Sequence, residues 1–304
     1  METRNLGNTG LSVTALGYGA MELRHLREQD AARLLNAVLD GGINFVDTSP
    51  DYGPSEAYIG KAISHRRDEY VLATKCGCNV DVNGKSLDPG HIWSREKLLA
   101  NIENSLRLLK TDTIDVWQLH GTMPGDLAGG KADDVIKTMQ ELKQLGKVRV
   151  LAISFRNGGR GDPLYPAGYG FDCIQEYVNW GIFDVMQIVY GGLTRQSELA
   201  ITKAADMGIG IVVRGVVKRY HDNYDALFEQ AGLDELCQDG EGTNSFLVRY
   251  AMSHPGVSTM IVGTKSHDHL AENIAAATKG ELPDDVYTKA RQRLDAIGLT
   301  ASNV

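Results

Sequence analysis

The chain has 304 residues, of which 42% are hydrophobic and 23% charged, and its formal net charge is −8. This composition is typical of a globular protein with a large apolar core, and the length suits either two domains or one large α/β barrel. The acidic balance, without a basic stripe, argues against a nucleic-acid-binding protein, and the apolar runs are too short to span a membrane.

The four cysteines are too few for a disulfide framework. Two of them form Cys76-Gly77-Cys78, and this C-x-C motif has no second pair to complete a zinc site, so no metal site is expected. We therefore expect reduced thiols and a cytoplasmic protein. The N-terminal residues support the same expectation of a cytoplasmic protein, since they lack the apolar core of a signal peptide.

Eight short apolar segments recur along the chain, and most are continuously apolar rather than alternating. They lie at 13–21, 44–49, 70–76, 114–121, 148–154, 183–191, 208–215 and 258–264. Continuous runs of this kind are typical of strands buried on both faces of a parallel sheet. Before the first of them, Gly7 and Gly10 predict a hairpin that caps the strands.

Segments with helical spacing of apolar residues alternate with these strands. They lie at 28–42, 94–112, 131–147, 197–208, 244–256 and 267–278. Strand and helix alternate without a change in composition, which predicts one (β/α)8 TIM barrel domain over residues 1–304. A doubly wound sheet is the alternative, but Gly17 and Gly19 lack the third glycine of its dinucleotide motif.

Polar residues stand at the carboxyl ends of several predicted strands, where a barrel gathers its functional side chains. Asp47, Lys75 and His120 end three of the strands, and Tyr52 follows in the loop after Asp47. Each alone has a structural explanation, such as turn capping or a satisfied core histidine. Together they are hard to explain that way, because each costs desolvation unless it is paired. Asp51 is interpreted as a residue that stabilises the turn and has no part in the site.

Together, these four residue types suit a site in which the tyrosine donates a proton and the other three assist it. A tyrosine with an ordinary pKa of about 10 is a poor acid near neutrality. We expect the ammonium of Lys75, held by Asp47, to lower the pKa of Tyr52, and His120 to orient a carbonyl oxygen. Such a site reduces a carbonyl to an alcohol only if a nicotinamide cofactor supplies the hydride.

The chain resembles the aldo-keto reductase family in the stretches NFVDTSPDYG, YVLATKC, SREKLLANIENSLRLLKTDTIDVWQLHG and IVGTKSHDHLAENI. The resemblance covers essentially the whole chain. It implies a (β/α)8 barrel that binds NADP(H) without a Rossmann domain, with the catalytic tetrad Asp47, Tyr52, Lys75 and His120.

The resemblance also implies cofactor-binding residues. Ser154 and Gln187 match residues at the nicotinamide, and Arg214 stands where many members have a stacking aromatic residue. The remaining candidates, at the pyrophosphate and the adenosine, are Lys218, Arg219, Gly263, Thr264, Lys265, His269, Glu272 and Asn273. Lys265 and His269 suit a 2′-phosphate, which favours NADP(H), with NAD(H) as the alternative.

This chain departs from the family pattern after Ser154, where the usual Asn is replaced by Phe155. Two polar stretches, 77–91 and 157–171, are longer than plain connections, and such loops are often functional. Loops also hold the candidate substrate-binding residues, which are Met21, Trp93, Met123 and Tyr190.

The sequence thus predicts an NADP(H)-dependent oxidoreductase that interconverts a small-molecule carbonyl (aldehyde, ketone or sugar) and an alcohol. Two alternatives remain. Lys75 could form a Schiff base, as in aldolases, although a neighbouring Asp47 argues for a charged lysine. The chain could also be a low-turnover, redox-sensing subunit of a larger assembly. No oligomeric state is predicted.

Overall fold

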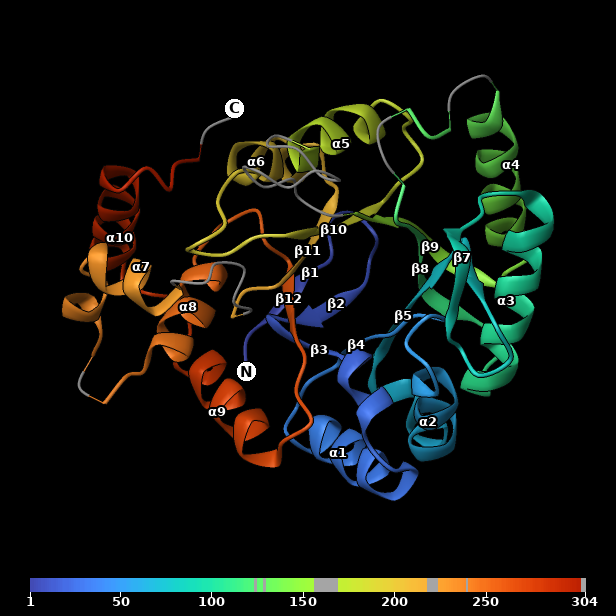
Figure 1. Ribbon diagram of the computed structural model, residues 1–304, viewed down its shortest axis with the longest axis horizontal. Helices are drawn as coiled ribbons and strands as arrows, with labels where there is room; N and C mark the ends of the chain where they lie inside the picture. Colours follow the sequence, from blue (N-terminus) through green and yellow to red (C-terminus); the bar gives the residue numbers. More distant parts are fainter. Residues whose placement is uncertain (123–124, 128–129, 156–168, 218–223, 239, 302–304) are drawn as a thin grey trace.

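The computed structural model describes residues 1–122, 125–127, 130–155, 169–217, 224–238 and 240–301. Among them, eight parallel strands close into a barrel with helices around it (Figure 1). In their order around the barrel they are β3 (Leu16–Gly19), β4 (Phe45–Asp47), β5 (Val71–Cys76), β8 (Ile114–His120), β9 (Val148–Ser154), β10 (Val185–Val189), β11 (Gly210–Arg214) and β12 (Thr259–Val262). The predicted barrel is confirmed.

The strands are buried on both faces, which explains their continuous apolar sequences. Val116 and Val212 belong to a cluster that fills the barrel interior. Their neighbours Trp117 and Val213 belong to the larger cluster between the strands and the helices. Successive side chains of a strand point to opposite faces, so one apolar run supplies both layers.

The helices lie outside the strands. They are α1 (Glu28–Asp40), α2 (Ser55–Ala62), α3 (Arg95–Leu109), α4 (Lys131–Gln144), α5 (Tyr169–Val178), α6 (Glu198–Asp206), α7 (Tyr224–Gln230), α8 (Thr243–Met252), α9 (His267–Lys279) and α10 (Asp284–Ala296). The six predicted helices are present, and α2, α5, α7 and α10 are additional. In the described part of the chain, none is long and apolar enough to cross a membrane.

The predicted N-terminal hairpin closes one end of the barrel. Its strands β1 (Thr3–Asn5) and β2 (Ser12–Thr14) pair antiparallel. Leu6, Leu11 and Val13 join the interior cluster, so the hairpin seals the barrel with apolar side chains. Its turn needs glycine, because Gly7 has a φ of 53° and a Cβ there would lie 2.3 Å from the Gly210 nitrogen.

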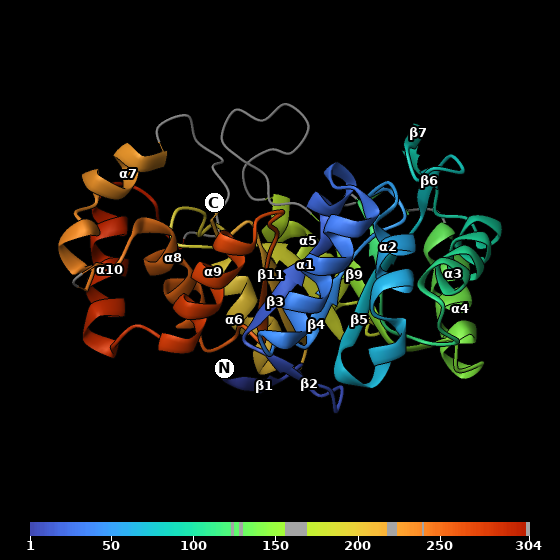
Figure 2. The same cartoon turned by 90° about the horizontal axis from the view of Figure 1, so that it is seen from below.

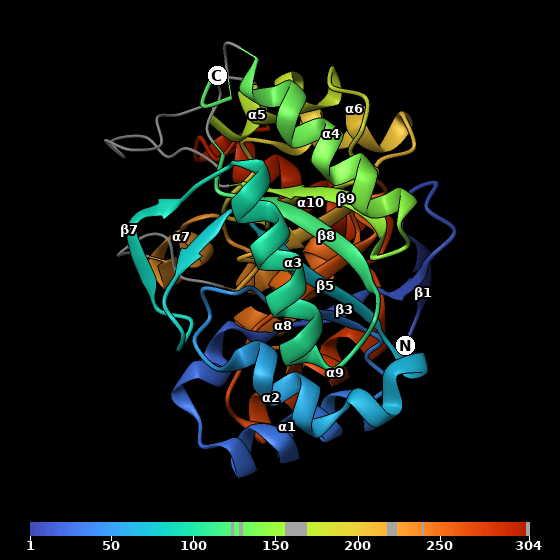
Figure 3. The ribbon, with the colours of Figure 1, turned by 90° about the vertical axis from the view of Figure 1, so that its right-hand side faces the viewer.

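A second hairpin lies at the opposite end of the barrel, beyond the carboxyl ends of the strands (Figure 2). It consists of β6 (Cys78–Val80) and β7 (Ser86–His91), within the stretch predicted as a long loop. Asn101 of α3 anchors its base, accepting from the Gly77 nitrogen at 2.8 Å and donating to the Cys78 carbonyl at 3.2 Å. Figure 3 shows this hairpin standing beside α3.

A carboxylic acid is buried between α2 and the barrel. Glu56 is 1% exposed, and one of its carboxyl oxygens accepts a hydrogen bond from the Thr74 hydroxyl at 2.7 Å. Burial raises the pKa of Glu56 from 4.5 to about 7, and the bond from Thr74 offsets only part of that effect. Between those two pH values the folded protein holds a proton that the unfolded chain releases.

The free energy of unfolding is therefore expected to fall as the pH rises from 4.5 to about 7, by roughly 3 kcal/mol from this group. Glu56→Gln keeps the side chain neutral and should remove this loss. Urea unfolding at pH 5 and pH 8 should show the variant gaining stability over the wild type mainly at pH 8. An equal difference at both pH values would contradict the prediction.

Candidate active site

An ion pair lies at the carboxyl ends of β4 and β5. The Lys75 ammonium donates to Asp47 Oδ2 at 2.7 Å and to the Thr48 carbonyl at 2.8 Å. Both charged side chains are only 1% exposed. Burial by itself lowers the pKa of Lys75, but the charges of Asp47 and Tyr52 and the bond to Asp47 outweigh it, so the pKa is raised. A lysine held in its charged form is a poor Schiff-base nucleophile.

The other oxygen of Asp47 connects the ion pair to strands across the barrel. Asp47 Oδ1 accepts from Gln118 Nε2 at 2.7 Å and from Gln187 Nε2 at 2.8 Å. Gln187 in turn accepts from the Ser154 hydroxyl at 3.0 Å. Gln118 was not among the predicted residues, although it stands two positions before His120 and so shares its face of β8.

Tyr52 lies against the lysine, with the Lys75 ammonium 4.9 Å from the centre of its ring. Burial raises the pKa of Tyr52, and the charge of Lys75 only partly opposes this. The predicted lowering is therefore wrong in direction, because desolvation of the phenolate exceeds the attraction to the ammonium. At neutral pH the phenol keeps its proton, which is the form that a proton donor requires.

His120 lies at the edge of this group, among residues of the β6–β7 hairpin. Its Nδ1 is 3.2 Å from His91 Nε2, 3.3 Å from Cys78 Sγ and 3.8 Å from Asp51 Oδ2. The Trp93 indole donates to the His120 carbonyl at 2.9 Å. Asp51 thus faces His120, and interpreting it as turn chemistry alone was incomplete.

Arg214 ends β11 and donates to the Phe155 carbonyl at 2.9 Å. Its positive charge opposes the rise in the pKa of Tyr52. Phe155 is 1% exposed and its ring packs against Tyr177. The side chain therefore lies in the helical layer and does not take the place of the family's asparagine. The predicted residues Lys218 and Arg219 lie outside the described residues.

The turn between β12 and α9 carries the predicted adenosine-binding residues. Thr264 is buried, and its carbonyl accepts from the Tyr18 hydroxyl at 2.8 Å. The Ser266 side chain caps the first turn of α9. The remaining candidates are mostly exposed, namely Gly263, Lys265, His269 and Glu272, with Asn273 half-buried. Their charged groups are accessible to a ligand at the strand ends.

The candidate substrate-binding residues lie in different surroundings. Met21 lies in the 3-10 helix η1 (Ala20–His25) that follows β3, and Trp93 lies beside His120. Met123 lies outside the described residues. Tyr190 is misassigned, because it is fully buried and its hydroxyl donates to Glu198 on α6 at 3.4 Å. Polar partners in the helical layer direct this tyrosine away from the strand ends.

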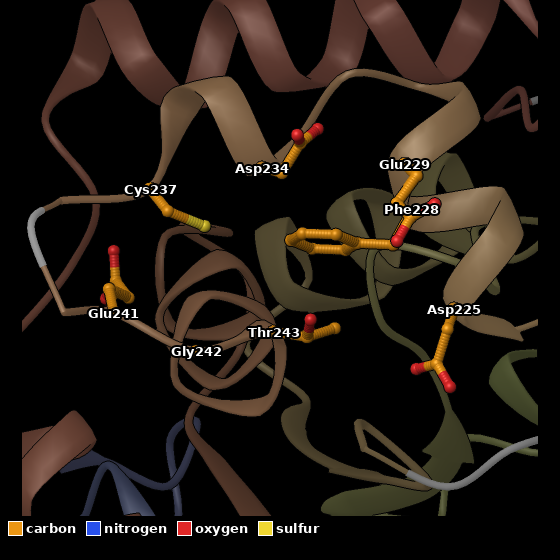
Figure 4. A pocket seen from close by; sticks show the side chains of 8 residues that line it. All are labelled: Asp225, Phe228, Glu229, Asp234, Cys237, Glu241, Gly242 and Thr243. Carbon is orange, nitrogen blue, oxygen red and sulfur yellow. The ribbon is translucent and has the colours of Figure 1, made fainter.

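A separate cavity of about 310 Å³ lies between α7, η3 (Asp234–Leu236) and the start of α8 (Figure 4). It is lined by Asp225, Phe228, Glu229, Asp234, Cys237, Glu241, Gly242 and Thr243. Four carboxylates make it unsuitable for the phosphates of a dinucleotide. No strand-end residue contributes to it, so the tetrad lies elsewhere.

Comparisons with known proteins agree with this geometry. L-galactose dehydrogenase of Arabidopsis thaliana is 28% identical over 305 residues, which cover 92% of this chain and 89% of that protein. A 6-dehydroglucose reductase of Novosphingobium aromaticivorans is 34% identical over 165 residues, or 50% of each chain. A solved aldo-keto reductase of Bacillus halodurans (holo form) is 28% identical, with a TM-score of 0.80 over 96% of both chains. Residues 15–295 match the model of the aldo/keto reductase family, and the chain belongs to that family.

Proposed function

We propose that the protein is an NADP(H)-dependent oxidoreductase that interconverts a carbonyl and an alcohol, with Tyr52 as the general acid and base. The observation that carries this proposal is the buried assembly of Asp47, Lys75 and Tyr52, in which a protonated phenol lies against a charged ammonium. Membership of an oxidoreductase family supports the same reaction class.

In the reducing direction, a nicotinamide cofactor would, when bound, supply the hydride for the carbonyl carbon. The Tyr52 phenol gives its proton to the carbonyl oxygen, so the alcohol leaves neutral. Lys75 stabilises the tyrosinate that remains, and Asp47 keeps the ammonium charged and in place. His120 donates a hydrogen bond that orients the carbonyl. Oxidation of an alcohol runs the same proton transfer in reverse.

The chain's polar groups fit a nicotinamide cofactor. Ser154 and Gln187 present a hydroxyl and an amide beside Asp47, which suits a carboxamide. Lys265 and His269 are exposed at the start of α9, where positive charge and the helix N-terminus both favour a phosphate. The 2′-phosphate of NADP(H) is the group that this pair of residues would bind.

For the substrate, we propose a sugar or a similarly hydroxylated carbonyl compound. Two relatives, by their names, act on L-galactose and on 6-dehydroglucose. Trp93 beside His120 offers an aromatic surface, and Arg214 offers hydrogen-bond donors at the end of β11. Stacking of a ring on an aromatic side chain and hydrogen bonds to hydroxyl groups are what sugar binding needs.

Tyr52→Phe removes the proton donor and keeps the ring against Lys75. We expect kcat for carbonyl reduction to fall about 10²–10⁴-fold, with NADPH binding unchanged. Tyr58→Phe is the matched control, since this tyrosine on α2 donates to the Leu26 carbonyl. Steady-state kinetics and NADPH fluorescence titration measure the two quantities. Near-normal turnover in Tyr52→Phe would show that another group moves the proton.

Lys265→Ala tests the cofactor assignment. Loss of a charged hydrogen bond to the 2′-phosphate should raise KM for NADPH about tenfold and leave KM for NADH unchanged. Lys279→Ala, in the last turn of the same helix, is the matched control. A wild-type protein that prefers NADH, or equal effects on both cofactors, would refute the phosphate contact.

A panel of aldehydes, ketones and sugars, assayed with NADPH and NADP⁺, separates the enzyme from the low-turnover sensor. We expect turnover of at least about 1 s⁻¹ with one hydroxylated compound, within the usual range for enzymes. Binding of NADPH without turnover of any member of the panel would instead favour the sensor.

A further inference from the structure

Four potential metal ligands gather beside the tetrad. They are Asp51, Cys78, His91 and His120, and one ligand atom from each lies within 4.8 Å of all the others. None of these residues except His120 has a part in the proposed reaction. The four come from three places in the fold, which are the loop after β4, the base of the β6–β7 hairpin and the end of β8.

Their spacing suits one tetrahedral ion. Zinc binds sulfur at about 2.3 Å and nitrogen or oxygen at about 2.0–2.2 Å, which places neighbouring ligand atoms about 3.3–3.7 Å apart. His120 Nδ1 is 3.2 Å from His91 Nε2, 3.3 Å from Cys78 Sγ and 3.8 Å from Asp51 Oδ2. The pairs that do not include His120 lie within 4.8 Å of each other, so their separations need to shorten by at most about 1.5 Å around a central ion.

We propose that Asp51, Cys78, His91 and His120 bind a zinc ion. A thiolate, two imidazoles and a carboxylate favour Zn²⁺ over Mg²⁺ or Ca²⁺, which prefer oxygen ligands alone. Binding requires the Cys78 thiolate, so the thiol proton passes to solvent and affinity rises with pH. The site goes beyond the proposed function, because binding the ion requires no substrate or cofactor.

The hairpin places two of the ligands by its own pairing. Cys78 and His91 stand directly opposite each other at its base, which Asn101 anchors to α3. The His91 ring stacks on Trp93, with their planes 1° from parallel. Glycine at position 121 makes room for this ring, since a Cβ there would lie 2.7 Å from His91 Cε1. The ligands are therefore held before any ion arrives.

Groups around the cluster orient the other ligands. The Ser49 hydroxyl donates to the Asp51 carboxylate and lies 3.5 Å from Cys78 Sγ. The Trp93 indole holds the His120 carbonyl. Hydrogen bonds from neighbouring residues to the metal ligands fix the orientation of those ligands and commonly affect metal affinity.

One consequence rests on the proposed function. His120 is both a zinc ligand and the residue proposed to orient the carbonyl. Zinc at Nδ1 fixes its ring toward the hairpin and places a cation beside the substrate. We therefore expect zinc to inhibit turnover, so that occupancy of the site regulates the reaction.

Binding is tested on the full-length, metal-free protein by calorimetric titration with Zn²⁺ and by absorbance with Co²⁺. The expected result is one ion per chain, with a thiolate-to-Co²⁺ charge-transfer band and the intense visible bands of tetrahedral Co²⁺. A wild-type protein that binds no ion, or binds Co²⁺ without the thiolate band, overturns the proposal. Neither measurement depends on activity, so it decides the site even if no substrate is found.

Variants locate the site. Cys78→Ser and His91→Ala should each weaken Zn²⁺ binding at least about tenfold. Cys237→Ser is the matched control, because Cys237 lies beside Asp234 and Glu241 in the acidic cavity of Figure 4. Loss of binding in Cys237→Ser, with full binding in Cys78→Ser, overturns the proposal. His91 is only half-buried, so His91→Ala should fold, and thermal unfolding checks this.

Inhibition is measured as the ratio of the turnover rates with and without Zn²⁺. Each variant is compared with its own rate in the absence of zinc. The wild type should lose most of its activity at one equivalent of bound ion, and His91→Ala should keep its zinc-free rate at the same concentration. Equal inhibition of both proteins overturns the regulatory consequence. An absence of turnover in every protein counts against the proposed function, and the binding titrations still decide the metal site.

Discussion

The ion pair of Lys75 and Asp47 is the contact on which both the barrel and the site depend. Removing two charges from water costs several kcal/mol for each ion, so a pair that is 1% exposed needs further partners. Asp47 obtains them from Gln118 and Gln187, and Lys75 from the Thr48 carbonyl. These bonds join β4, β5, β8 and β10, so the register of four strands and the charge of the lysine are maintained together.

The loop that carries Tyr52 is held between this ion pair and the second hairpin. The Gly53 nitrogen donates to the Gly84 carbonyl at 3.2 Å, which ties the loop to the hairpin tip. The base of the same hairpin brings Cys78 and His91 to His120. The long polar stretch 77–91 therefore supports the loop of Tyr52 and completes a cluster of metal ligands. His120 links the tetrad to that cluster.

Much of the site could be predicted because the carboxyl ends of barrel strands converge wherever the strands lie in sequence. Asp47, Lys75 and His120 were found in this way, and the structure places them at those ends. The direction of the shift in the pKa of Tyr52 could not be predicted, because it depends on how far burial outweighs the charge of Lys75. Tyr190 was misassigned because position after a strand does not show which layer a side chain faces.

The sequence by itself determined the eight barrel strands, six of the helices around them, the closing hairpin and the residue types at the strand ends, because apolar periodicity is a local property. Only the tertiary structure decided how donors from distant segments meet. Along the sequence, Cys76 and Cys78 form an incomplete zinc motif, whereas the cluster in space spans Asp51 to His120. Metal ligation and desolvation depend on distances and burial in space, and neither can be read from neighbours along the chain.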